Sequence, residues 1–144
     1  MESIEQKTKD MIKRHEGFRP HVYLDTVGIP TGGYGHAFQK GSHLSQEVCN
    51  LLFEDDYQQA RADMERLINQ YAFELNLVRE AVLVDMLFNL GLTRLKGFKK
   101  MLTALQKGDW EAAANEMVNS TWYTQTKTRA VELVEMMRTG KWVL

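Results

Sequence analysis

The sequence predicts an α+β fold that is predominantly helical, with a small N-terminal antiparallel sheet lobe, a long connecting helix and a C-terminal helical lobe. Strand-like residues between glycines occur in one stretch only, residues 17–36. Apolar residues recur at helical spacing before that stretch and over most of the chain after it. The 144 residues are enough for one globular domain with a real core.

We expect a single domain over residues 1–144, with the strand lobe at about 16–44, the connecting helix at about 45–70 and the helical lobe at about 76–144. The N-terminal helix, residues 4–15, is expected to belong to the helical lobe.

The first elements are predicted by their end signals. Ser3-x-x-Gln6 is the pattern of a capping box, so a helix is expected to follow it and to end before Gly17. In residues 17–36, glycines alternate with Val, Ile and Tyr, which favours short strands joined by tight turns. Ser45 is placed to cap the connecting helix, whose apolar positions leave one face to acidic residues.

The helical lobe is expected to begin with a central helix. Asn76 can cap residues 77–90, which are apolar almost all round, and Gly91 can end them in the left-handed conformation. Such a helix is typical of the middle of a bundle. Further helical patterns follow at about 95–106, 110–119 and 128–138, with residues 121–126 as a separator.

The charge balance excludes a strongly polyanion-binding surface. Eighteen basic and nineteen acidic residues give a net charge of −1, so no nucleic-acid partner is expected. The charges are unevenly distributed, because residues 41–75 carry two basic and seven acidic residues, whereas residues 76–144 carry ten and seven. Any anionic partner must therefore be bound locally.

Several other function classes are also excluded. One cysteine, Cys49, rules out an intramolecular disulfide, and we expect its thiol to be buried and inert. The four histidines have no metal-ligand spacing, so neither a metal nor another cofactor is expected. No apolar run approaches the length of a membrane span, and the N-terminus lacks the order of a signal peptide. We therefore expect a monomer without stable membrane insertion, made in the cytoplasm of its cell.

The candidate catalytic residues are acidic side chains in or beside the glycine-rich segment. Glu16 stands at the end of the first predicted helix, before Gly17, while Asp25 and Thr31 lie in the strand-and-turn region. Hydrolysis of a glycosidic bond needs one carboxylic acid that protonates the leaving oxygen and one carboxylate that assists water or faces the sugar. An acidic residue beside a glycine is more often a solvated turn, so the spacing alone leaves both interpretations open.

The order of residue types along this segment is more informative than the spacing of its acidic residues. The segment matches Glu-Gly-x-Arg-x-x-x-Tyr-x-Asp-x-x-Gly-x-x-Thr-x-Gly-x-Gly-His at residues 16–36. This pattern resembles the N-terminal motif of the phage-type lysozymes, the endolysin family of muramidases. The resemblance continues nearly to the end of the chain, in Phe88-Asn89-Leu90-Gly91, Gly97-Phe98, Asp109-Trp110-Glu111-Ala112-Ala113, Trp122-Tyr123-Thr124-Gln125-Thr126, Arg129-Ala130 and Arg138-Thr139-Gly140-x-Trp142.

The resemblance implies a fold with the active cleft between the two lobes. It implies that Glu16 is the general acid, that Asp25 is the second acidic catalytic residue and that Thr31 holds the attacking water. The implied substrate is bacterial peptidoglycan, cut at the β-1,4 bond between N-acetylmuramic acid and N-acetylglucosamine. No metal or cofactor is implied.

The same resemblance assigns supporting residues. Arg129 matches an arginine beside the catalytic glutamate, with a solvated arginine as the alternative. His36 matches a histidine paired with an aspartate of the connecting helix, here Asp56, with a free imidazole as the alternative. Phe88 and Asn89 match residues that line the cleft and contact the sugar, although Phe88 equally suits core packing.

Three roles remain open for such a chain. The main expectation is an endolysin that lyses the host cell, reaching the wall after release by a separate holin-like membrane-permeabilising protein. The same fold used as a bacterial toxin or effector against rival cells is the first alternative. A non-catalytic wall-binding module is the second, and it has no physical need for the acidic residues.

Overall fold

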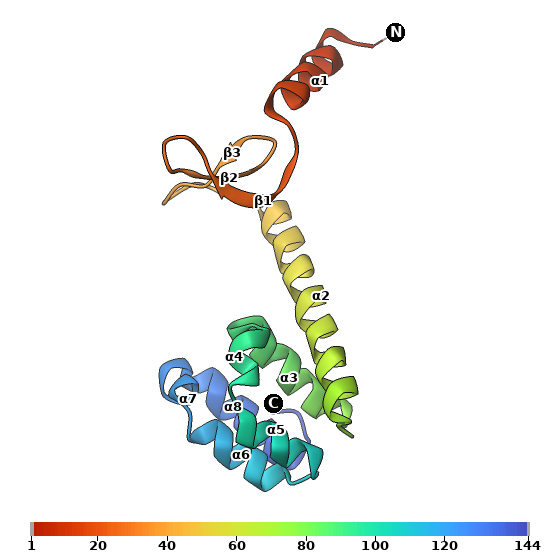
Figure 1. Cartoon of the computed structure of the whole chain (residues 1–144), viewed down its shortest axis with the longest axis vertical. Coiled ribbons are helices and arrows are strands. Elements are labelled where there is room, and N and C mark those ends of the chain that lie inside the picture. Colours follow the sequence, from red (N-terminus) through yellow and green to blue (C-terminus); the bar gives the residue numbers. More distant parts are fainter. Residues whose placement is uncertain (1, 144) are drawn as a thin grey trace. The chain divides into compact units, whose positions relative to one another are not determined.

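The computed structural model describes residues 2–143 and divides the chain into two compact units, Met1–Ser45 (unit 1) and Gln46–Leu144 (unit 2). Each unit is described by itself. The elements, labelled in Figure 1, give an α+β architecture that is predominantly helical, as the sequence predicts. None of the described helices is long and apolar enough to cross a membrane.

Unit 1 opens with helix α1, Ile4–Glu16. The Ser3 hydroxyl caps it by accepting a hydrogen bond from the Gln6 backbone N–H at 3.1 Å. At the other end Gly17 has φ +72°, and its N–H donates to the Lys13 carbonyl at 2.9 Å. The predicted capping residue and helix are confirmed, with the helix one residue longer than expected.

A three-stranded antiparallel sheet follows in the order β1-β2-β3. Its strands are β1, Arg19–Leu24; β2, Pro30–Gly33; and β3, His36–Ala37. Thr31 in the central strand pairs with Tyr23 on one side and with Ala37 on the other. The strand lobe predicted from the glycine pattern is confirmed, and residues 31 and 32 are buried in its central strand.

Unit 2 is built on two long helices, α2, Gln46–Tyr71, and α3, Leu77–Leu90. The Asn76 side chain caps α3 by accepting from the Arg79 N–H at 2.9 Å, as predicted. Helix α3 packs against α2, α4 and α8, and half of its residues are buried, so its predicted place inside the bundle is confirmed (Figure 1). Gly91 ends it with φ +79° and ψ 164°, outside the left-handed helical conformation that we expected.

The rest of the bundle differs from the prediction at two points. The expected helix at 95–106 is two helices, because the chain turns at Gly97 and Phe98, whose N–H groups donate to the Arg94 and Leu95 carbonyls. The expected separator at 121–126 is itself a short helix, capped by the Ser120 side chain. The helices are α4, Leu92–Lys96; α5, Lys99–Gln106; α6, Trp110–Val118; α7, Thr121–Thr126; and α8, Thr128–Thr139.

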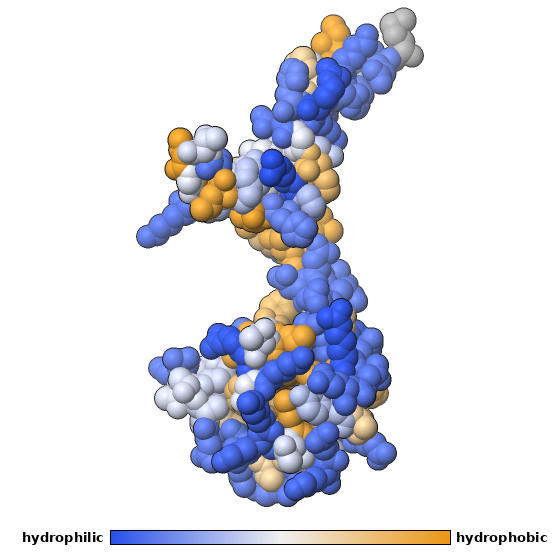
Figure 2. Space-filling model, in the orientation of Figure 1, coloured by the Kyte–Doolittle hydropathy of each residue, from blue (hydrophilic) through white to orange (hydrophobic). Residues whose placement is uncertain are grey.

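The described core lies in unit 2. Its fully buried side chains include Leu67 of α2, Leu83 of α3 and Met137 of α8. Hydrophilic residues predominate on the face of the helices seen in Figure 2, with apolar patches between them. Cys49 is exposed on α2, so the expectation of a buried thiol is wrong; the apolar pattern of that helix is buried only from Ala60 onward.

Candidate active site

Glu16 is positioned by the end of α1. It is the last helical residue, and the positive φ of Gly17 then turns the chain toward β1. Its exposed side chain lies against Gly35, in the turn between β2 and β3: a Cβ atom built on Gly35 would be 2.9 Å from Glu16 Cδ and in closer contact with Oε2. Two segments nineteen residues apart therefore meet at the Glu16 carboxylate.

Asp25 is held by the turn that joins β1 to β2. Its Oδ1 accepts hydrogen bonds from the N–H groups of Val27, at 2.9 Å, and Ile29, at 2.8 Å. The backbone closes the same turn through Asp25 N–H to the Ile29 carbonyl, at 3.0 Å. One carboxylate oxygen is thus committed to the backbone, and Oδ2 takes no part in either bond.

Thr31 lies in β2, the central strand, with only 5% of its surface exposed. Its hydroxyl donates to the Ile29 carbonyl at 2.8 Å. Because a hydroxyl has a single hydrogen, the remaining capacity of Oγ1 is to accept. Ile29 links the two residues, since its N–H binds Asp25 and its carbonyl binds Thr31.

Unit 1 therefore contains all three predicted catalytic residues, on the end of α1, the turn after β1 and strand β2. Gly35 directly precedes His36, which pairs across the sheet with Gly32, the residue after Thr31. The His36 ring packs edge-on against Phe38 with 4.8 Å between the centroids. Within residues 2–143, no group of three or more His, Cys, Asp or Glu side chains is arranged to hold a metal ion.

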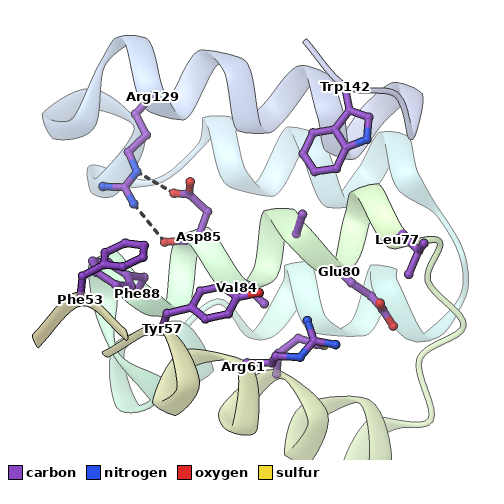
Figure 3. A pocket seen from close by; sticks show the side chains of 12 residues that line it. Phe53, Tyr57, Arg61, Leu77, Glu80, Val84, Asp85, Phe88, Arg129 and Trp142 are labelled. Atoms are coloured by element: carbon purple, nitrogen blue, oxygen red, sulfur yellow. Dashed lines mark hydrogen bonds and ion pairs between the residues drawn. The ribbon is translucent and has the colours of Figure 1, made fainter. Parts of the chain in front are cut away.

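Two other predicted residues converge on a pocket of unit 2. Phe88 and Arg129 both line a cavity of about 500 Å³ between α2, α3 and α8 (Figure 3). Arg129 donates from Nε to Asp85 Oδ1 at 2.6 Å, in a half-exposed ion pair. The Phe88 ring, 39% exposed, lies 5.5 Å from that of Phe53.

Sequence reasoning did not identify Asp85 as the Arg129 partner. The spacing of 44 residues gives no signal for the pair, which only the packing of α3 against α8 creates.

Asn89 has a partner of its own in unit 2. Its Oδ1 accepts a hydrogen bond from the indole N–H of Trp122 at 2.8 Å. Trp122 is 5% exposed and belongs to α7, so this bond ties the end of α3 to that short helix. The amide NH₂ of Asn89 keeps its two donors for another group. Asp56, the predicted partner of His36, is an exposed residue of α2.

Comparison with known proteins gives a consistent result. The family model described as phage lysozyme matches residues 13–138. The chain is 27% identical to probable T4-type lysozyme 1 of Dictyostelium discoideum, over 92% of its own length and 94% of that protein. It is 30% identical to the endolysin of Acyrthosiphon pisum secondary endosymbiont phage 1, with 80% and 77% covered.

A third relative is a larger protein. The chain is 33% identical to the pre-baseplate central spike protein Gp5 of Enterobacteria phage T4, where it covers 91% of its own length but spans only 27% of the spike protein.

The chain combines a small antiparallel sheet with a helical bundle, and the phage lysozyme family model covers most of its length. The chain belongs to the phage lysozyme family.

Proposed function

We propose that the protein is a muramidase that hydrolyses the β-1,4 bond between N-acetylmuramic acid and N-acetylglucosamine in bacterial peptidoglycan. Membership of the phage lysozyme family supports a peptidoglycan hydrolase, and the relatives named lysozyme and endolysin cover most of the chain. The observation that carries the assignment of roles is the Asp25–Ile29–Thr31 arrangement, in which the Ile29 backbone binds both side chains and Thr31 Oγ1 keeps the capacity to accept a hydrogen bond.

Glu16 is the general acid in this proposal. As the glycosidic C–O bond breaks, its protonated carboxyl gives its proton to the leaving oxygen, which becomes a hydroxyl of the released sugar. The positive charge that develops at the anomeric carbon is an oxocarbenium-like charge, which a nearby carboxylate stabilises. The exposure of the Glu16 side chain leaves it accessible to a polymeric substrate.

Asp25 and Thr31 assist the attacking water. The Thr31 hydroxyl already donates its hydrogen to the Ile29 carbonyl, so it can only accept a hydrogen bond from the attacking water. That hydrogen bond orients a lone pair of the water oxygen toward the anomeric carbon. Asp25 Oδ2 takes the other hydrogen as the new C–O bond forms. One proton leaves Glu16 and one reaches Asp25, so a proton exchange with solvent restores the starting state.

The decisive experiment compares wild type with Glu16→Gln on peptidoglycan suspensions, measured by loss of turbidity. The amide keeps the shape but cannot supply the proton, so we expect clearing to slow by about a hundredfold or more. Glu5→Gln is the matched control, because Glu5 lies on the same helix in an exposed pair with Lys9. Equal clearing by wild type and Glu16→Gln would contradict the proposal.

Mass spectrometry of the products tests the reaction type separately. Hydrolysis leaves a reducing muramic acid end, whereas a 1,6-anhydro end would mean that a sugar hydroxyl, and not water, attacks the anomeric carbon. The second result would refute the roles given to Asp25 and Thr31.

The residues of unit 2 complete the proposal. Phe88 offers an aromatic face to a sugar ring, and the Asn89 NH₂ offers two donors to its polar substituents.

We further propose a biological role in host lysis. The protein would be made in the cytoplasm and act on the wall after a holin-like protein opens the membrane, working as a monomer without cofactor. A lysis assay in a host that expresses the protein with and without a holin tests this role. Lysis that needs no permeabilising protein would contradict it.

The likeness to the central spike protein favours a second role, as part of a phage particle. Antibody detection of the chain in purified virions would support this role, and its absence from virions would favour lysis from within. A toxin or effector role would require an associated immunity protein.

A further inference from the structure

Gly35 has two separate reasons to lack a side chain. Its φ of +74° is a conformation that favours glycine, and the space that a Cβ would need is taken by Glu16. The nearest Glu16 carbons, Cδ and Cγ, would be 2.9 Å and 3.3 Å from that Cβ, whereas ordinary contacts lie at 3.4–4 Å. The carboxyl group therefore lies directly on the backbone of the β2–β3 turn.

Gly41 provides a comparison within the same unit. It has φ +85°, so it favours glycine for the same conformational reason, but no atom lies within 4 Å of a Cβ built there. An alanine at residue 41 would meet the backbone strain alone. An alanine at residue 35 would meet that strain and the Glu16 carboxyl.

Few contacts other than the one with Gly35 hold the Glu16 side chain in place. Among the described residues of unit 1, no hydrogen bond or ion pair holds the Glu16 carboxylate. Its position is set by the end of α1, by the turn at Gly17 and by packing against the β2–β3 turn. A side chain anchored by packing alone moves when its support moves.

We propose that Gly35 is a positioning residue for Glu16: the bare backbone of the β2–β3 turn is the surface on which the acid rests. This inference depends on the proposed function for the role of Glu16, but the contact itself does not. Proton delivery needs the donor and acceptor atoms within about 3 Å, so a displaced carboxyl loses rate even when the fold is intact.

The expected effect of Gly35→Ala follows from the geometry. To restore an ordinary contact, the Glu16 Cδ must retreat by at least roughly half an ångström, and Oε2 by more. The carboxyl is the far end of a flexible side chain, so it yields more readily than the backbone. Since a misplacement of about 1 Å can cost a hundredfold in rate, we expect kcat to fall about ten- to a hundredfold.

The experiment compares Gly35→Ala with Gly41→Ala in the full-length protein. Soluble peptidoglycan fragments give kcat and KM, and urea unfolding gives stability. The ¹³C shift of the Glu16 carboxyl, assigned by its loss in Glu16→Gln, reports the contact without requiring activity. We expect both variants to lose stability through backbone strain, a change in the Glu16 shift in Gly35→Ala only, and a kcat loss in that variant with KM within about twofold.

Three outcomes would overturn the inference. An unchanged Glu16 shift in Gly35→Ala would show that the contact is absent. Equal kcat losses in both variants would mean that backbone strain, and not the carboxyl, is responsible. A raised KM with unchanged kcat would mean that the added methyl obstructs the substrate. Should wild type prove inactive, the proposed function fails by itself, and the carboxyl shift still decides whether Gly35 positions Glu16.

Discussion

Arg79 provides the sharpest test of how unit 2 is held together. The residue is 8% exposed, on the first turn of α3, and reaches the last turn of α8. Its Nε donates to the Met137 carbonyl at 2.8 Å, and Nη2 to the Arg138 carbonyl at 3.2 Å. The guanidinium also lies 4.2 Å from the centre of the Trp110 ring. Burial lowers the pKa of Arg79 from its ordinary value, but the group stays charged at neutral pH.

The perturbation is Arg79→Met, which keeps the apolar stem and removes every donor. A lost hydrogen bond from a charged donor destabilises by about 1.5–3 kcal/mol, so the two bonds together suggest about 3–6 kcal/mol. The variant no longer buries a charge, which offsets part of that loss. We expect a net destabilisation of about 2–4 kcal/mol, which corresponds to a fall in Tm of roughly 10 °C for a chain of this size.

Urea and thermal unfolding followed by circular dichroism measure the effect. Arg94→Met is the matched control, because Arg94 is an exposed residue of α4 in the same unit, and it should lose less than about 0.5 kcal/mol. Similar losses in the two variants would refute the reasoning, since the carbonyls of α8 would then gain nothing from Arg79.

The remaining predictions concern Thr31 in unit 1, Gly140 in unit 2 and the net charge of the chain. Thr31→Val should lower kcat about a hundredfold if the hydroxyl holds the attacking water as proposed, and it should cost only about 1 kcal/mol in urea unfolding, because the Ile29 carbonyl keeps its bond from the Asp25 N–H. Gly140→Ala should destabilise by about 1–3 kcal/mol in urea unfolding, because φ is +70° and a Cβ would be 2.8 Å from Arg79 Nη1. With a net charge of −1, clearing of wall suspensions should fall only shallowly with added salt, and a steep loss would contradict weak electrostatic steering.

The helices that could be predicted from sequence are those with a capping residue at the start and a glycine at the end. Helix α3 was expected at residues 77–90 and lies there, because Asn76 caps it, Gly91 ends it and its residues are apolar almost all round. Helix α7 was missed because Thr, Trp and Tyr are weak helix formers. It is held by burial of Trp122 and by the Ser120 cap, and only the second of these can be read locally.

In the candidate site, too, some features can be predicted from sequence and others cannot. The motif predicts Glu16, Asp25 and Thr31 as the catalytic residues from the order of residues alone, because their neighbours in the pattern are glycines and other residues of the motif. Contacts between distant segments, such as Glu16 with Gly35 or Arg129 with Asp85, depend on packing that no local pattern encodes. Sequence reasoning therefore proposes the chemical groups, whereas the contacts that hold them in place are seen only in the three-dimensional structure.

Asp25 holds its turn and, in the proposed function, also takes part in the reaction, which has a consequence for how this position can vary. Folding of the turn requires only an oxygen that accepts from the Val27 and Ile29 N–H groups, which asparagine also supplies. The proposed reaction additionally requires a negative charge at this side chain. A natural variant with asparagine at this position should therefore be well folded but inactive. A variant with alanine should lose both the activity and the hydrogen bonds of the turn, so it should also misfold. The two substitutions would thus differ in how much folded protein is found in cells that carry them.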